Sequence, residues 1–167
     1  MERRYETAYG TLTLRAETPG DEPYLFALFK SHTERPLKQA GLPDAAIDTM
    51  VGFQYRAQTS THRSMFPNAV FWIIEQDGVP MGRIIEDDEG DAIYWVDFVI
   101  DPKLQAKGLG TAFIIAMADG WAAQGKGVRV EVQPQNFHSL KLCAKSGMTK
   151  YADLPSGYIG LRRGVPK

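Results

Sequence analysis

The chain has 167 residues and a formal net charge of −1, with 44% hydrophobic and 23% charged residues. These values favour one soluble globular domain over residues 1–167 and exclude the basic surface of a nucleic-acid-binding protein. The longest apolar run, residues 108–125, is too broken by Asp119 and glycines to cross a bilayer, and one cysteine with no apolar leader predicts a cytoplasmic protein.

The N-terminal part of the chain predicts one strand followed by two helices. Apolar and polar residues alternate over 11–18, which is typical of a half-buried strand. Asp21 suits the N-cap of a helix over 21–33. A turn-rich segment at 35–43 separates this helix from a second one over 44–66.

The remaining elements follow from apolar periodicity and turn residues. In chain order they are strands over 70–76, 79–87 and 91–101, a helix over 108–126, a strand over 128–134, a helix over 136–147, and strands over 148–155 and 158–163. The order βααβββαβαββ predicts an α/β (α+β) fold with a mixed, mostly antiparallel central sheet of about seven strands flanked by helices.

The most informative stretch is VIDPKLQAKGLGT at 99–111, where a strand ends and glycines open a helix. Amides at a helix N-terminus have no partners within the helix, and the helix dipole adds partial positive charge. This end therefore attracts an anion such as a phosphate. Gly108 and Gly110 let a ligand approach the backbone closely, and Lys107 adds a positive charge.

Two phosphate-binding motifs are excluded here, because Phe113 occupies the third glycine position of GxGxxG and no GxxxxGK[ST] is present. Gln105, Gly108 and Gly110 instead match QxxGxG. This segment resembles the acetyl-CoA pyrophosphate loop of the GNAT superfamily of N-acetyltransferases. A second block of that family, which follows a later strand, is matched by Asn136, Ser139, Leu142, Cys143, Gly147 and Met148.

The resemblance implies an N-acetyltransferase with acetyl-CoA as its cofactor. The amides of residues 105–110 would hold the pyrophosphate, and the backbone of residues 98–100 would bind the pantetheine arm. An amide of Val99 or Ile100 would also serve as an oxyanion hole. Asn136 could bind the cofactor or be only an N-cap. The full set of expected cofactor-binding residues is Phe98, Val99, Ile100, Gln105, Ala106, Lys107, Gly108, Leu109, Gly110, Thr111, Asn136, Ser139, Leu142 and Cys143.

Acetyl transfer also needs a deprotonated amine, and an amine of pKa ~10.4 is unprotonated only about once in 2,500 molecules at pH 7. Asp97 lies between Val96 and Phe98, next to the expected cofactor-binding backbone. We favour Asp97 as the general base or amine anchor. A structural carboxylate bonded to an arginine or to backbone amides is the alternative, and Tyr94 or a water chain could also serve as the base.

Cys143 is the second candidate catalytic residue, because the family usually has a tyrosine here whose hydroxyl is proposed to protonate the leaving sulfur. A thiolate leaves fairly well without help, since the thiol pKa is ~8.5. We therefore expect Cys143 to form a small apolar wall beside the cofactor sulfur, with water or Tyr151 supplying any proton. A proton-donor role for Cys143 stays open.

The acceptor amine is expected beside the second helix. Gln54 and Gln58 are i,i+4 neighbours that could form a hydrogen-bonding wall, although a solvated helix face explains them equally well. Tyr94 and Glu131 complete the expected substrate-binding set. No triad or metal-ligand spacing links the histidines, which we expect at the surface without a metal: His32, His62 and His138.

The sequence thus predicts direct acetyl transfer from acetyl-CoA to a primary amine of a small molecule or peptide. The protein is expected to be a monomer or homodimer that binds neither nucleic acid nor membrane. A non-catalytic acyl-CoA-binding or regulatory module is one alternative, because Cys143 replaces the tyrosine. A dinucleotide-binding oxidoreductase is another, and it rests only on Gly108 and Gly110.

Overall fold

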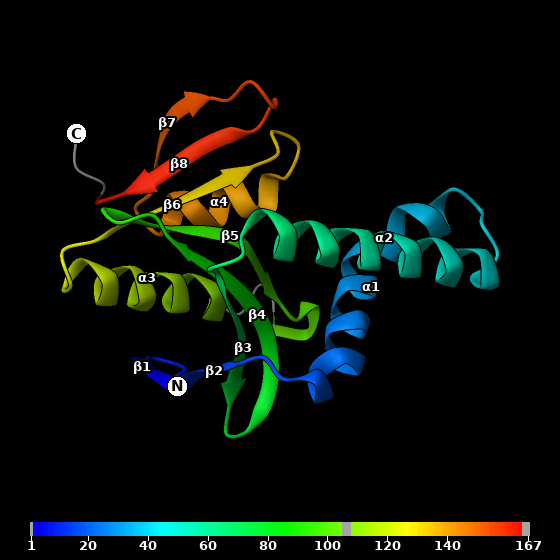
Figure 1. Ribbon diagram of the computed structural model, residues 1–167, viewed down its shortest axis with the longest axis horizontal. Coiled ribbons are helices and arrows are strands. Elements are labelled where there is room, and N and C mark those ends of the chain that lie inside the picture. Colours follow the sequence, from blue (N-terminus) through cyan, green and yellow to red (C-terminus); the bar gives the residue numbers. More distant parts are fainter. Residues whose placement is uncertain (1, 105–107, 165–167) are drawn as a thin grey trace.

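Figure 1 shows the computed structural model, which describes residues 2–104 and 108–164. Over these residues, eight strands form one sheet in the order β1-β2-β3-β4-β5-β6-β8-β7, and only β5 and β6 pair in parallel. The strands are β1 (Glu2–Thr7), β2 (Gly10–Ala16), β3 (Val70–Gln76), β4 (Val79–Asp88), β5 (Ala92–Ile100), β6 (Gly127–Val132), β7 (Thr149–Asp153) and β8 (Ile159–Arg163). The helices are α1 (Glu22–Gln39), α2 (Asp44–Met65), α3 (Leu109–Ala122) and α4 (Phe137–Lys145), with short 3-10 turns η1 (Pro19–Asp21) and η2 (Pro102–Leu104).

The predicted mixed, mostly antiparallel α+β fold is confirmed, with two differences near the N-terminus. The sequence does not predict β1, because its residues are mostly charged or polar. This edge strand is held by β2 and by Tyr5, whose ring packs edge-on against Phe113 of α3 at 5.7 Å. The turn expected from residue 35 is also wrong, since α1 continues to Gln39. Pro36 lies in the last turn of that helix, where its missing amide removes only one hydrogen bond.

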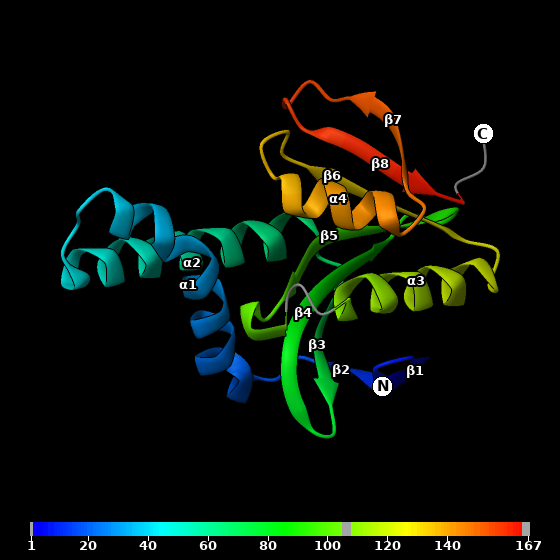
Figure 2. The same cartoon turned by 180° about the vertical axis from the view of Figure 1, so that it is seen from behind.

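Helices cover both faces of the sheet. Ile74 of β3 packs in a core with α3 and α4, whereas its neighbour Ile73 packs with Leu25 of α1 and Tyr55 of α2. Burying a side chain of this kind contributes roughly 1.5–3 kcal/mol, so both layers stabilise the sheet. Seen from behind, α4 crosses in front of β6 (Figure 2). No helix in the described part of the chain is long and apolar enough to cross a membrane.

The two parallel strands separate part-way along their length. Pairing between β5 and β6 runs from Ala92↔Gly127 to Tyr94↔Arg129, and the described residues form no register pair beyond that point. β5 also bulges, because Asp97 and Trp95 pair with consecutive residues of β4 and leave Val96 between them. A bulge bends and twists its strand. Figure 1 shows β5 continuing beside β4 while β6 turns away from it.

A buried carboxylate fixes the strand next to this bulge. Glu86 of β4 is 5% exposed and forms an ion pair with Arg3 of β1. Its Oε2 also accepts hydrogen bonds from the indole nitrogens of Trp95, at 2.9 Å, and Trp121, at 2.8 Å. Because a buried carboxylate is costly unless it is fully bonded, this network holds Trp95, and with it the start of the bulge, in one position.

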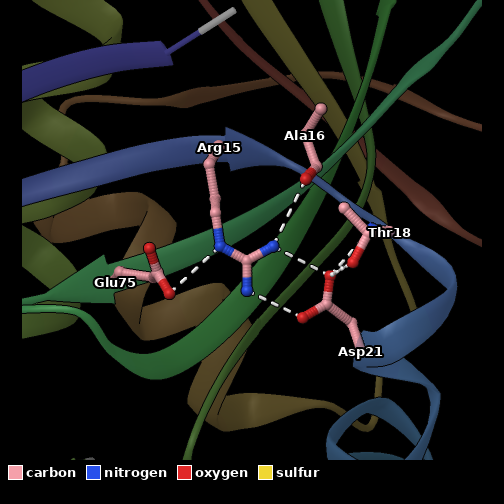
Figure 3. Close-up of polar contacts among 5 residues, drawn as sticks. All are labelled: Arg15, Ala16, Thr18, Asp21 and Glu75. Carbon is pink, nitrogen blue, oxygen red and sulfur yellow. Dashed lines mark hydrogen bonds and ion pairs between the residues drawn. The ribbon is translucent and has the colours of Figure 1, made fainter.

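An ion-pair cluster positions the start of α1 (Figure 3). Arg15 of β2 donates to the two carboxylate oxygens of Asp21 at 2.7 and 2.8 Å, and it lies 3.1 Å from the Oε2 of Glu75 on β3. Asp21 occupies the predicted N-cap of α1, but its carboxylate accepts from Arg15 and from the amide of Thr18 at 2.8 Å. The cluster therefore ties the first helix to β2 and β3.

The Arg15 guanidinium holds the pKa of Asp21 well below its usual range. Such a carboxylate contributes stability above its unfolded-state pKa of ~3.9, and this contribution is lost as the pH falls toward the folded-state value. We expect Asp21→Asn to lower the free energy of unfolding by about 2 kcal/mol at pH 7, because charged hydrogen bonds are lost. It should also flatten the decline in stability below pH ~4.

Urea unfolding at neutral and acidic pH measures both effects. Asp48→Asn is the control, because Asp48 pairs with Lys30 on the exposed surface and should contribute little. Equal losses in the two variants would contradict a special role for Asp21.

Candidate active site

A cavity of about 330 Å³ lies between the N-terminus of α3 and one face of α4. Gly108, at the N-cap of α3, has a φ of 78°, in the left-handed region. A Cβ at this position would lie 2.4 Å from the hydroxyl oxygen of Tyr9, so only glycine fits without a shift. The residues that line the cavity are Ile100, Gly108, Gly110, Thr111, His138, Lys141, Leu142 and Lys145.

Two helices bring positive charge to this cavity. The Oδ1 of Asn136 accepts a hydrogen bond from the Ser139 amide at 3.2 Å, which caps α4 and fixes where it begins. Residues three or four apart then share a helix face, so Lys141 and Lys145 both reach the cavity. The N-terminus of α3 adds partial positive charge. The cavity therefore suits a ligand that carries phosphate groups.

Beyond Tyr94, the described residues of β6 no longer pair with β5, and this side of β5 runs toward the same cavity. Ile100 belongs both to β5 and to the cavity lining. The Asp101 amide donates to the Met81 carbonyl of β4 at 2.8 Å. Since amides alternate in direction along a strand, that of Phe98 points to the side that β6 leaves, whereas that of Val99 points to β4 and cannot serve as the expected oxyanion hole. The backbone of β5 can therefore bind an extended ligand as an added strand.

Comparison with known protein families identifies the family of this chain. Residues 40–148 match the model of the acetyltransferase (GNAT) family. The chain belongs to the GNAT family. Acetyl-CoA is the standard cofactor of that family. No curated protein sequence matches the chain.

Solved structures of other GNAT proteins share this fold. The PaiA N-acetyltransferase from Thermoplasma acidophilum in complex with coenzyme A aligns with a TM-score of 0.65 and 14% identity, covering 91% of this chain and 98% of that one. The ribosomal-protein-S18-alanine N-acetyltransferase from Escherichia coli aligns with a TM-score of 0.59 and 14% identity, covering 93% and 95%. The aminoglycoside acetyltransferase AAC(6')-Ib in complex with coenzyme A aligns with a TM-score of 0.61 and 20% identity, covering 91% and 94%.

The residues present fit the GNAT cofactor. Its phosphates match the α3 N-terminus with Lys141 and Lys145, and its extended arm matches the open edge of β5. Gly110 lies between the apolar side chains of Ile100 and Leu142, which a Cβ at this position would meet at ordinary contact distances of 3.8 and 3.7 Å. The cavity therefore offers both the charge and the apolar surface that coenzyme A requires.

The predicted cofactor-binding residues divide into several groups. Five line the cavity, namely Ile100, Gly108, Gly110, Thr111 and Leu142. Leu109 is buried in the core, and the Phe98 ring stacks on Phe113 at 6.3 Å, so only the Phe98 backbone faces the parting strands. Asn136 and Ser139 are bonded to each other as the α4 cap. Gln105, Ala106 and Lys107 lie outside the described residues.

Sequence reasoning missed three cavity residues on α4. His138, Lys141 and Lys145 follow the spacing i, i+3, i+7, which places them on one helix face. This pattern is visible in the sequence, but it indicates a site only once the α3 N-terminus is known to lie opposite. His138 is exposed, as expected, and it also lines the cavity.

Cys143 lies in the core, and it is not among the residues that line the cavity. It is 5% exposed and belongs to a cluster that includes Met148 and Leu161. Burial raises the pKa of its thiol to about 11, so the thiol is protonated at neutral pH. This burial disfavours a thiolate nucleophile, and the position agrees with an apolar packing role.

On the opposite face of the sheet, Asp97 is held by an arginine. Its Oδ2 accepts from the Nε of Arg83 at 3.0 Å and from Nη2 at 2.5 Å. Arg83 is 8% exposed, and its Nη2 also lies 3.4 Å from the Oε1 of Gln58 on α2. This arrangement matches the alternative expectation for Asp97, a carboxylate bonded to an arginine.

The other predicted acceptor residues lie near the parting strands. The Tyr94 ring is 5.6 Å from Phe66, the residue that follows α2, and the Arg129 guanidinium lies 3.9 Å from its centre. Glu131 is 3.4 Å from Arg129 on the same strand. Tyr94 and Glu131 thus lie together beside the end of α2. Gln54 is exposed further back on that helix.

His62 differs from its expected surface position. It lies half-buried in the last turn of α2, four residues after Gln58 on the same helix face. It lines a small polar cavity of about 10 Å³ together with Glu17 and Arg83. The i,i+4 spacing from Gln58 is the sequence pattern that could have drawn attention to it.

We expect Gly108→Ala to weaken acetyl-CoA binding about tenfold or more, because alanine is strained at this φ and its Cβ meets Tyr9. Isothermal titration measures the dissociation constant. Gly125→Ala is a matched control, since Gly125 has the same φ of 78° but nothing lies near its Cβ position. Equal weakening in both variants would show that the contact at Gly108 is irrelevant.

Cys143→Ala should keep turnover within a few-fold of normal and lower stability by about 1 kcal/mol, because it removes one buried sulfur from the core. Steady-state kinetics and urea unfolding check the two parts. A fall in turnover of more than about a hundredfold, with the fold intact, would instead support a proton-donor role.

Proposed function

We propose that the protein is an N-acetyltransferase that moves an acetyl group from acetyl-CoA directly to a primary amine of a small molecule or peptide. One observation carries this proposal. Ile100 ends the β5 edge that β6 leaves, and it also lines the cationic cavity between α3 and α4. An extended arm along β5 and phosphates at α3 would together hold a ligand with the shape of coenzyme A.

Each part of this arrangement would have its own role. When bound, acetyl-CoA supplies the acetyl group as a thioester. The amides of Gly108 and Gly110, with the α3 dipole, would hold the pyrophosphate, and Lys141 and Lys145 would balance the remaining phosphate charge. An amide of β5 on the side that β6 leaves would stabilise negative charge developing on the acetyl oxygen.

The acceptor would approach from the opposite face, between the end of α2 and the parting strands. Tyr94, Glu131 and Arg129 would form the wall on the strand side, and Phe66, whose ring lies 5.6 Å from that of Tyr94, would form the helix side, with His62 one turn before it. The named relatives differ in their acceptors, since one acetylates a ribosomal-protein alanine and another an aminoglycoside. Both are amines, which is the acceptor class that we propose.

A non-catalytic acyl-CoA-binding module is the second candidate, and the buried Cys143 favours it. The family usually has a tyrosine at this position. In this chain the residue is a cysteine whose thiol packs in the core, so no hydroxyl is present to protonate the leaving sulfur. This module would bind acetyl-CoA and transfer the acetyl group to no amine.

Isothermal titration followed by a thiol-release assay separates these candidates. We expect acetyl-CoA to bind with a dissociation constant below ~1 mM and NAD to show no binding. With a panel of polyamines, aminoglycosides and peptides with free N-termini, we expect free coenzyme A to be released with at least one amine. Binding without release across the panel would favour the second candidate, and no binding of acetyl-CoA would refute both.

A further inference from the structure

Acetyl transfer requires a group that accepts a proton from the acceptor amine, and Asp97 is the first candidate. Its Oδ2 takes two N–H groups from Arg83, which is itself 8% exposed. A proton on Asp97 would break this ion pair and leave the arginine charge buried without its partner, which is costly. Asp97 can therefore provide a fixed negative charge, but it is poorly suited to accept the proton that the amine must lose.

The other polar groups near the parting strands are no better suited. Burial and the neighbouring Glu131 raise the pKa of Tyr94 far above its usual value, so its hydroxyl stays protonated. Glu131 is paired with Arg129, at 3.4 Å. Cys143 is a protonated thiol in the core on the other face of the sheet.

His62 differs from these groups because one of its ring nitrogens is left without a partner among the described residues. In the described part of the chain, its Nδ1 is buried and has no hydrogen-bond partner. The imidazole lines the small polar cavity under α2, and the charges of Asp97 and Arg83 both act on it. The polar groups that line this cavity with it are Glu17 after β2, Arg83 from β4, and Tyr55, Thr59 and Arg63 from α2 itself, while β3 and β4 add the apolar Phe71 and Ile85.

We infer that His62 is the general base of the acetyl transfer, with Asp97 held by Arg83 as the group that orients the amine. The inference rests on the proposed function and names a residue for one of its steps. The amine nitrogen forms the new C–N bond, the C–S bond breaks and the sulfur leaves with its electron pair, and the amine proton passes to an imidazole nitrogen. The C-terminal end of α2 stabilises the imidazolium that forms.

The protonation state of His62 agrees with this role. Burial lowers the pKa of the imidazole, and Arg83 lowers it further, while Asp97 opposes them. The imidazole is therefore neutral and able to accept a proton at pH 7. Below its pKa it is protonated and the reaction should slow, so the rising limb of the pH–rate profile should lie at or below ~6.5.

His62→Gln tests this assignment, because glutamine keeps a polar side chain and cannot accept the proton. At pH 7 we expect kcat/KM for the amine to fall about 10²–10³-fold. The rising limb of the pH–rate profile should move toward the pKa of the amine itself. The loss in kcat/KM relative to the wild type should therefore shrink as the pH rises to ~9 or ~10. The dissociation constant for acetyl-CoA should not change. His32→Gln, on the exposed part of α1, is the matched control and should keep the wild-type profile.

A second measurement does not depend on turnover. The imidazole of His62, followed by NMR in the wild-type protein with coenzyme A bound, should titrate at the pH of the kinetic limb. This reading stands even if His62→Gln does not fold.

The outcomes separate the two proposals. A wild-type protein that binds no acetyl-CoA, or that acetylates no amine, refutes the proposed function and this inference with it. A wild-type protein that turns over while His62→Gln keeps its rate and limb refutes only the inference. If the rising limb of the pH–rate profile is lost in Asp97→Asn and kept in His62→Gln, the general base is Asp97 instead.

Discussion

The separation of β5 from β6 is the constraint on which the candidate site depends. Parallel pairing ends at Tyr94↔Arg129, and a bulge at Val96 bends β5 immediately beyond it. The buried Glu86 holds Trp95 just before that bulge, so the bend is fixed from the core side. Because β6 turns away, the side of β5 beyond Tyr94 has no neighbouring strand among the described residues, and this is the opening where a ligand can bind.

The two faces bring different chemistry to this opening. On the α3 and α4 face, a helix N-terminus and two lysines create positive charge around apolar residues, which suits a long anionic cofactor. On the α2 face, Arg83 is paired with Asp97, and Arg129 lies close to Glu131, so charge is balanced in pairs. A neutral imidazole beside the Arg83–Asp97 pair can take a proton without disrupting that pair.

Much of the fold follows from local sequence patterns, and the exceptions have physical reasons. The strand predicted over 70–76 is confirmed at its full length, since Ile73 and Ile74 are buried on opposite faces and the run is apolar from Val70 to Ile74. β1 is not predicted because polar residues form it, and its contacts with α3 come from Tyr5 against Phe113 and Arg3 against Trp121. The half-buried position of His62 is not predicted for a similar reason, because Glu17 and Arg83, which share its cavity, are distant in the chain.

The sequence by itself determined the order of elements from β2 onward, the glycine turn that opens α3 and the membership of the GNAT family, since each depends on spacing along a few consecutive residues. The tertiary structure alone decided which groups meet. It placed Cys143 in the core, bound Asp97 to Arg83, and set Lys141 and Lys145 opposite Gly108. These outcomes depend on strand twist, a bulge and the packing of helices on a bent sheet, which arise from contacts between residues far apart in the chain.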